Sequence, residues 1–388
     1  MNSNFIPLSV PSLRGNELNY IKKCIDTEWV SSGGSYVSKF EVDIARYAAA
    51  KYAIACANGT SALHICLILS GVKEKDEVIV PTVTFIAPVN TVRYIKATPI
   101  FMDCDDYLNI DIDKLTEFCN EECDFTAGKL INKKSGATIK AIIPVHIFGN
   151  PVNIEPLMDL AYRYNLKVIE DAAESLGSYY TGGSYNNKKT GTIGDLGCYS
   201  FNGNKIITTG GGGMIVTDNP EYAQRARYLT TQAKDDSLSY IHNEIGYNYR
   251  MTNVQAAIGC AQLEQIDKYI EIKRNNFVVY REAVSDIEGL DLIGEPNYGF
   301  SNFWHYSLLV DEKKYGCSRN ELIQRLSRNN IQSRPLWRLS HLQQPYEGFG
   351  AYKINRALHY QDRVLNIPCS VGLKEEHIRK VISVLKNA

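Results

Sequence analysis

CYSFNGNKIITTGGGGMIV, residues 198–216, places a single lysine, Lys205, between an apolar segment and four consecutive glycines. Glycines carry no side chain, so the backbone here can approach a bulky ligand closely. Ser200, Asn202 and Asn204 add hydrogen-bonding groups to the same turn. An amine in this setting can form an imine with an aldehyde. The alternative is a surface lysine beside a glycine-rich hairpin.

Short apolar segments alternate with helical patterns from about residue 36 to residue 230. The helical patterns include 35–52, 58–72 and 153–165. We expect strands within 53–58, 77–81, 98–105, 141–149, 167–172, 196–201 and 212–218. The polar residues 128–140 are expected to form a surface loop or turn. This alternation predicts an α/β fold, with a mostly parallel sheet covered by helices on both faces.

The length of 388 residues predicts a large domain and a smaller one. We expect the large domain to span residues 1–250, with about residues 1–35 near the functional site. Residues 254–284 predict one long helix that leads away from it. The rest of 251–388 predicts a smaller α+β domain, with a strand in 302–310 and helices in 318–330 and 374–387.

Composition excludes several classes of protein. The net charge of -1 gives no support to nucleic-acid binding. The ten cysteines are scattered, without a CxxC pair or the Cys/His spacing of a metal site, and reduced thiols are typical of the cytosol. No basic start precedes an apolar core at the N-terminus, and no apolar run reaches about eighteen residues. We therefore expect a soluble cytoplasmic protein with no metal and no membrane contact.

A second candidate segment is Asn58-Gly59-Thr60-Ser61, where a strand turns into a helix. Free N–H groups and the helix dipole favour a phosphate there, and the hydroxyls of Thr60 and Ser61 can add hydrogen bonds. An ordinary helix N-cap explains the same residues.

Two more candidates follow predicted strands. Asp171 stands at the end of a strand, where parallel sheets bind ligands, and can pair with a protonated ring nitrogen. Its alternative is a helix N-cap. Phe85 follows the strand 77–81 and can stack on a flat heterocycle, with a core phenylalanine as the alternative.

The ordered segments NGTSAL (58–63), PTVTFIAPVN (81–90), EDAAES (170–175), SFNGNKIITTGGGG (200–213) and GYNYRMTNVQAAIG (246–259) resemble a known family. They are similar to the DegT/DnrJ/EryC1/StrS aminotransferases, which have fold type I, use pyridoxal 5′-phosphate and act on nucleotide-linked keto sugars. The resemblance extends from about residue 14 to the C-terminus.

The resemblance implies a role for each matching residue. Lys205 is implied to be the Schiff-base lysine, and Asp171 to pair with the pyridine nitrogen. The cofactor phosphate is implied to bind Thr60, Ser61 and Ser200, and Phe85 to lie against the ring. Asn248 is implied to reach the cofactor phosphate of a second subunit, which makes the protein a homodimer with shared active sites. Glu174 is placed at the cofactor, where many members carry His or Gln, and Gly211 stands where many carry Glu.

The resemblance also implies the reaction. L-glutamate would convert the cofactor to pyridoxamine 5′-phosphate, and a keto sugar would then accept the amino group while Lys205 moves the proton. TTQAKDD (230–236), GYNYRM (246–251) and QSRPLWRLSHLQ (332–343) are similar to the PglE/LegC-type branch, which aminates a UDP-linked 4-keto-6-deoxy-N-acetylhexosamine for bacillosamine and legionaminic acid. The alternative is a perosamine-synthase-like enzyme acting on a GDP- or dTDP-linked keto sugar.

Candidates for binding the sugar nucleotide are less specific. The turn WVSSGG (29–34), with Ser31 and Ser32, can cross the mouth of the site or be a plain loop. Arg334, Trp337 and His341 offer a cation, a flat surface and a hydrogen-bonding ring, and structural roles are equally open to them. His146 and His305 lie in apolar segments and are expected to be core histidines.

Two other classes of protein compete with the aminotransferase hypothesis. A binding protein without catalysis is disfavoured because Lys205 and all the other motifs are present, and a dehydratase of this family would carry His in place of the lysine. A dinucleotide-dependent oxidoreductase is disfavoured because no GxGxxG follows the first strand, and because residues 210–213 precede a strand rather than a helix.

Overall fold

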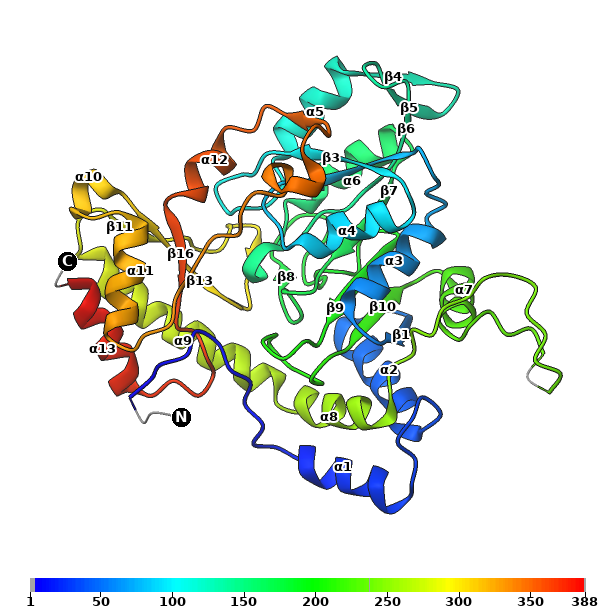
Figure 1. Cartoon of the computed structure of the whole chain (residues 1–388), viewed down its shortest axis with the longest axis horizontal. Coiled ribbons are helices and arrows are strands. Elements are labelled where there is room, and N and C mark those ends of the chain that lie inside the picture. Colours follow the sequence, from blue (N-terminus) through cyan, green and yellow to red (C-terminus); the bar gives the residue numbers. More distant parts are fainter. Residues whose placement is uncertain (1–3, 237, 387–388) are drawn as a thin grey trace.

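The computed structural model describes residues 4–236 and 238–386, and a large sheet forms its centre (Figure 1). Its strands are, in spatial order, β1 (Tyr52–Cys56), β10 (Gly213–Thr217), β9 (Leu196–Ser200), β7 (Lys167–Asp171), β6 (Thr138–Ile142), β2 (Glu77–Pro81), β3 (Thr98–Met102) and β15 (Ala351–Tyr352). β10 pairs antiparallel with β1 and β9, and all pairs from β9 to β15 are parallel. The mostly parallel sheet expected from the sequence is confirmed.

Helices cover both faces of this sheet, which explains why its strands are short and apolar. One face shares a core with α3 (Gly59–Leu69), α4 (Ile86–Tyr94) and α7 (Pro220–Thr230). The opposite face packs against α2 (Ser35–Ala48) and α8 (Asn253–Leu263) at one end. At its other end it packs against α5 (Ile112–Glu121) and α6 (Ile154–Arg163). α1 (Glu17–Asp26) lies outside, beside α8 (Figure 1).

The prediction of a loop over residues 128–140 is wrong. β4 (Cys123–Thr126) and β5 (Lys129–Asn132) form a hairpin, and β6 begins at Thr138, inside the expected loop. Leu130 pairs with Ile139, and both side chains are buried. Two buried side chains and a neighbouring strand are enough to order a stretch that is otherwise polar, because strand formation depends on context more than on composition.

The single long helix expected over residues 254–284 is also wrong in part, because α8 ends at Leu263 and α9 (Ile266–Ser285) follows after a short break. α8 packs against α1 and α2, and the side chain of Gln262 donates a hydrogen bond to the carbonyl of Ser12 at 2.8 Å. α9 begins in the same core as α8, with Ile266 and Ile270, and continues into a second core, which contains Phe277 and Tyr280.

A second, antiparallel sheet of β11 (Leu290–Leu292), β13 (Tyr306–Val310), β16 (Val364–Ile367) and β14 (Arg334–Pro335) belongs to that second core. α11 (Arg319–Arg328) and α13 (Glu375–Lys386) share the core with it. The remaining elements are α10 (Glu312–Tyr315), α12 (Arg356–Gln361) and the strand pair β8 (Tyr179–Tyr180) and β12 (Gly299–Phe300). The domain boundary at residue 250 stays a prediction, because α8 and β15 follow it and yet pack with the large sheet.

Two features of the fold prepare the site. β7 ends at Asp171 and β9 at Ser200, and α3 begins at Gly59 directly after β1, so three candidate segments meet at one edge of the sheet. The loop from α7 to α8 extends away from the sheet (Figure 1). Across residues 4–236 and 238–386, no helix combines the length and apolar character needed to cross a bilayer.

Candidate active site

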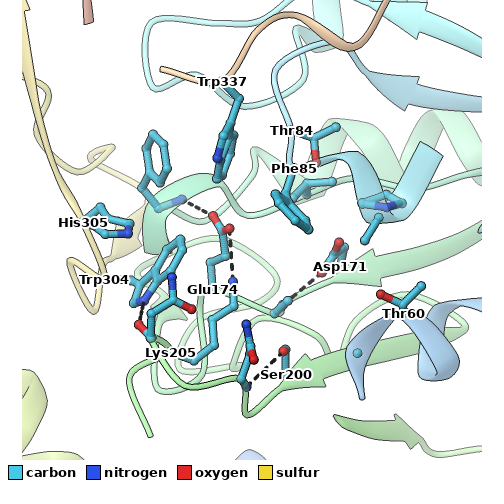
Figure 2. Close-up of a pocket in the computed structure, with 18 of the residues that line it drawn as sticks. Thr60, Thr84, Phe85, Asp171, Glu174, Ser200, Lys205, Trp304, His305 and Trp337 are labelled. Atoms are coloured by element: carbon cyan, nitrogen blue, oxygen red, sulfur yellow. Dashed lines mark hydrogen bonds and ion pairs between the residues drawn. The ribbon is translucent and has the colours of Figure 1, made fainter. Parts of the chain in front are cut away.

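A cavity of about 700 Å³ lies at this edge of the large sheet. Figure 2 shows Lys205, Asp171, Glu174, Phe85, Thr60 and Ser200 together around it. Residues near 304 and 334–338 complete its wall. The cavity therefore lies between the large sheet and the second one. Thr60 and Trp337 line the same cavity, although they are 277 positions apart in the chain.

Lys205 follows a tight turn after β9, in which its backbone N–H donates to the carbonyl of Asn202 at 3.0 Å. Its side chain is mostly buried, at 12% exposure. Nζ lies 3.3 Å from Oε1 of Glu174 and 3.9 Å from the centre of the Trp304 ring (Figure 2). The alternative of a surface lysine is excluded by this burial, and its amine faces the cavity.

Asp171 is 4% exposed and lines the cavity at the end of β7. Burial raises the pKa of its carboxyl. Its Oδ1 accepts a hydrogen bond from the backbone N–H of Ala173 at 3.0 Å. The next described element is the strand β8 and not an α-helix, so Asp171 is not the helix N-cap that the sequence left open. A buried carboxylate of this kind suits a cationic ring nitrogen.

Glu174 is buried close by, and burial raises the pKa of its carboxyl. Its Oε2 accepts a hydrogen bond from the backbone N–H of Phe148 at 2.8 Å, while Oε1 faces Lys205. The contact that the sequence left undefined for Glu174 is, in this structure, one with the lysine amine.

The N-terminus of α3 closes another side of the cavity. Asn58 caps the helix, because its side chain accepts from the N–H of Ser61 at 2.8 Å. A Cβ on Gly213 would lie 2.4 Å from the carbonyl carbon of Asn58, and one on Gly59 would lie 3.0 Å from Cβ of Ser200. These two glycines therefore allow α3 to lie against β10 and β9.

Thr60 and Ser200 line the cavity at this helix end, beside Gly211 and Gly212. Ser61 is buried and is not among the lining residues, so the structure does not bring its side chain into the same space. Helix N-termini with free N–H groups bind phosphates, so the arrangement is suited to a phosphate tail.

Phe85 is 56% exposed and lines the cavity, so it is not the core phenylalanine of the alternative interpretation. Its ring lies 6.2 Å from that of Trp337 in an edge arrangement (Figure 2). The neighbouring Thr84 also lines the cavity, and its Oγ1 is buried without a hydrogen-bond partner among the described residues. An unused hydroxyl beside an exposed ring and a buried carboxylate fits a polar aromatic ligand such as pyridoxal phosphate.

The candidates for substrate binding divide into two groups. Arg334 and Trp337 line the cavity, together with Arg338, which the sequence analysis did not select. His341 does not line it, and its Nδ1 instead shares a hydrogen bond of 2.6 Å with Oγ1 of Thr82.

Ser31, Ser32 and Asn248 are exposed and do not line this cavity either. Ser31 accepts a hydrogen bond at its carbonyl from the N–H of Asn253, at 2.8 Å. Asn248 pairs with Thr231 in an isolated bridge at the base of the extended loop. Their predicted roles stay predictions.

The two histidines differ in their surroundings. His146 is a buried core residue, as expected, with Nε2 3.0 Å from Oε2 of Glu170 and Nδ1 accepting from the N–H of Val152. His305 is buried as well, and burial lowers its pKa well below the usual value. His305 also lines the cavity, beside Trp304.

Sequence reasoning missed Trp304, Phe148 and the cavity position of His305. The segment NFWH (302–305) carries an aromatic pair at the start of the strand predicted over residues 302–310, and only this position at a strand end signals a cavity. The observed strand β13 begins just after it, at Tyr306. Trp304 is 99 positions from Lys205 in the chain, so no local sequence pattern indicates their contact.

The fold and the site define a pyridoxal-phosphate-dependent aminotransferase of nucleotide sugars. The DegT/DnrJ/EryC1/StrS aminotransferase family matches residues 11–386, and the chain belongs to this family. Its members use pyridoxal phosphate and the pyridoxamine form of that cofactor.

Individual relatives are similar over nearly their whole length. The chain is 38% identical to a GDP-perosamine synthase of Caulobacter vibrioides over 384 residues, which cover 98% of this chain and 97% of the relative. It is 38% identical to a GDP-perosamine synthase of Escherichia coli O157:H7 over 375 residues, which cover 96% of each. The crystal structure of a DegT DnrJ EryC1 StrS aminotransferase from Brucella abortus matches with a TM-score of 0.86 and 28% identity, over 96% of this chain and 95% of that one.

The comparisons confirm the family and the enzyme class. They do not support the finer prediction of a PglE/LegC-type branch, because relatives at 36–38% identity carry the GDP-perosamine synthase name. The three segments used for that prediction lie in the extended loop, at its base and in the cavity wall, and they are short compared with the whole chain.

Proposed function

We propose that this protein transfers an amino group from L-glutamate to the keto carbon of a GDP-linked 4-keto-6-deoxy sugar. The observation that carries the proposal is one cavity holding the buried amine of Lys205 together with two exposed guanidinium groups, Arg334 and Arg338. Amination of a nucleotide-linked keto sugar requires a reactive amine near the keto carbon and cationic groups near the diphosphate. The GDP-linked substrate is favoured by the relatives named for GDP-perosamine synthesis.

The cofactor end of the cavity would be held by residues of this chain. Asp171 would pair with the ring nitrogen, and Phe85 would lie on the ring. Thr60 at the start of α3 and Ser200 at the end of β9 would bind the phosphate. When bound, pyridoxal phosphate supplies an electron sink and a carrier for the amino group. The role of Asp171 is to keep the ring nitrogen protonated, for which a buried carboxylate is well placed.

Lys205 would act twice. It would bind the cofactor aldehyde at rest, and its free amine would carry the proton to and from the reacting carbon atoms. Glu174, 3.3 Å away, can hold the ammonium form of the lysine between these steps. Both side chains are largely buried, which keeps bulk water from the moving proton.

The outer end of the cavity would bind the nucleotide. Arg334 and Arg338 are suited to a diphosphate, because guanidinium groups bind phosphate oxygens in pairs. The Nε of Arg338 donates to the carbonyl of Leu342 at 3.0 Å. Trp337 offers a ring for the sugar or the base. His341, Ser31 and Ser32 remain candidates outside this cavity.

A second copy of the chain would complete each site. The loop from α7 to α8 exposes Leu238, Tyr240 and Ile245, which are 88%, 72% and 84% exposed. Exposed apolar side chains on a projecting loop are typical of a surface that another chain covers. In such a homodimer Asn248, at the base of this loop, would reach the cofactor phosphate of the partner subunit.

A second candidate substrate is a UDP-linked 4-keto-6-deoxy-N-acetylhexosamine. It is favoured by the segments TTQAKDD (230–236), GYNYRM (246–251) and QSRPLWRLSHLQ (332–343). GYNYRM contains Asn248, the predicted partner contact, and TTQAKDD contains Thr231, which pairs with Asn248. The reaction and the catalytic residues would be the same.

The test is to incubate the purified enzyme with GDP-, UDP- and dTDP-linked 4-keto-6-deoxy sugars, each with glutamate and with other amino acids. Mass spectrometry of the product and the ratio kcat/KM rank the substrates. The proposal expects the GDP-linked sugar and glutamate to give the highest ratio. Preference for the UDP-linked sugar supports the second candidate. Absence of amination for all three, while glutamate still converts the cofactor, would show that the sugar class is wrong but the aminotransferase chemistry correct.

A further inference from the structure

Several contacts fix the position of Trp304 in the cavity wall. Its indole Nε1 donates to the carbonyl of Asn204, the residue before Lys205, at 2.6 Å. Its backbone N–H donates to Oδ1 of Asn302 at 2.9 Å. The side chain is 3% exposed, and its ring packs against His305 at 4.0 Å between centroids. The plane of this ring is thus fixed relative to the turn that carries Lys205.

The amide of Asn302 also ties this position to the segment of Glu174. Its Nδ2 donates to the carbonyls of Glu174 and Leu176, each at 3.0 Å. The residues whose carboxylate and indole contact the lysine amine are therefore joined through one buried side chain, although they lie 130 positions apart in the chain.

The ring face of Trp304 is directed at the amine. Nζ of Lys205 lies 3.9 Å from the ring centroid, well inside the range of about 6 Å for a cation over an aromatic face. Nζ also donates a hydrogen bond to Oε1 of Glu174 at 3.3 Å, and burial raises the pKa of that carboxyl. A protonated lysine in this position thus contacts two groups at once, the carboxyl of Glu174 and the indole face.

We propose that Trp304 is a positioning residue whose indole face holds the protonated amine of Lys205 whenever this amine is not bonded to the cofactor. The inference rests on the aminotransferase chemistry of the family and not on the identity of the sugar. A lysine that alternates between an imine and a free ammonium needs a defined place for the ammonium. A flat, dry face adds to the hydrogen bond with Glu174 without adding a second carboxylate, so the amine can leave this place again.

Other charged or titratable groups face the same amine and are included in the test. Glu174 and Asp171 approach it from the segment at the end of β7, and His305 approaches from the side of the second sheet. Arg334 and Arg338 share the cavity. Substitution of Trp304 changes none of these charges, so its effect reports on the ring itself.

The experiment measures the reactivity of Lys205 in the cofactor-free protein. Trinitrobenzenesulfonate reacts with the neutral amine only, and mass spectrometry of the peptide that contains Lys205 gives the labelling rate as a function of pH. Trp304→Leu should move the midpoint of this profile to lower pH by about one unit, because a desolvated cation–π contact favours the ammonium by about that amount. Trp304→Phe keeps a ring face and should move the midpoint by less than about half a unit. Lys205→Ala is the control for assignment of the peptide.

A series of fluorinated tryptophans at position 304 is the second measurement, because fluorine weakens the negative ring face at nearly constant size. Each added fluorine should lower the midpoint further. In the loaded enzyme, Trp304→Leu should lower kcat about fivefold and leave KM for the keto sugar within about twofold, as expected for a residue that acts on proton transfer and not on substrate binding.

An unchanged midpoint in correctly folded Trp304→Leu, or a flat fluorination series, would overturn the proposal. Equal shifts for Trp304→Leu and Trp304→Phe would overturn it too, because the bond from Nε1 to Asn204 would then be responsible. Since labelling uses neither sugar nor glutamate, its outcome is independent of the proposed substrate.

Discussion

The inner and outer parts of the candidate site are built differently. The inner part, with Asp171, Glu174 and Lys205, is mostly buried at the ends of β7 and β9, and each side chain has a defined contact. Of the outer candidates, Ser31, Ser32 and Asn248 are exposed and lie outside the cavity of their own chain. One chain therefore brings the groups proposed for cofactor chemistry together with Arg334 and Trp337, whereas Ser31, Ser32 and Asn248 lie on segments outside this cavity.

The largest effect is expected at the centre of the inner part. Lys205→Ala should reduce amination by about 10⁴-fold, because the lysine supplies both the imine and the proton carrier. The fold should persist, since within residues 4–236 and 238–386 the amine's hydrogen bond is to Glu174 and its ring contact is with Trp304. Turnover is measured by product formation, and borohydride reduction followed by peptide mapping should find the cofactor on Lys205 in the wild type. Attachment to another lysine would refute the assignment.

Asp171→Asn is expected to reduce kcat by about 10²- to 10³-fold, because an amide cannot keep the ring nitrogen protonated. Cofactor binding should persist, since the size of the side chain is unchanged. Absorbance of the bound cofactor and single-turnover rates with glutamate separate the two properties. Near-normal turnover would mean that Asp171 has only a structural role.

Asn248→Asp tests the outer part. If Asn248 reaches the partner's cofactor, the new carboxylate would face a phosphate dianion and weaken cofactor binding by about tenfold. Mixing this variant with Lys205→Ala then creates heterodimers with one site that carries both changes and one that carries neither. Amination should exceed the sum of the two parents. No recovery after proven subunit exchange would place Asn248 at the site of its own chain.

The smallest effect concerns stability. Burial raises the pKa of Asp171 above its usual 3.8, so near neutral pH the ionised carboxyl costs the cofactor-free protein folding free energy. Asp171→Asn should therefore increase the free energy of unfolding by about 1 kcal/mol at pH 7. The gain should shrink as the pH falls and vanish below about pH 4, where the carboxyl is protonated in the folded and unfolded states. Urea unfolding of the cofactor-free variant and wild type at several pH values provides the measurement, and a gain that is independent of pH would contradict the charge explanation.

Much of the inner part could be predicted from the sequence, because local patterns determine it. Three local features indicate the edge of a parallel sheet: a strand followed by Asp171, a helix start at Gly59 and a turn before Lys205. The structure places all three at one cavity. Trp304 could not be predicted in this way, because its bond to the carbonyl of Asn204 spans 100 positions.

The two errors in the prediction of the fold also concern features that local composition does not mark. The strands within residues 123–142 depend on pairing of Leu130 with Ile139, and composition alone indicated a loop. The break between α8 and α9 contains no glycine or proline that would mark it in the sequence.

Asn302 has a consequence for protein engineering. Exchange of whole segments between relatives is a natural way to combine one enzyme's nucleotide preference with another's catalytic centre. In a chimera with a crossover between residues 178 and 302, the carbonyls of Glu174 and Leu176 keep their donor only where the parent of the C-terminal segment also carries Asn at position 302. Buried carbonyls left without their donor cost about 1–3 kcal/mol, and a displaced indole would add a loss of rate. Functional chimeras should therefore inherit residues 174–176 and 302–304 from the same parent.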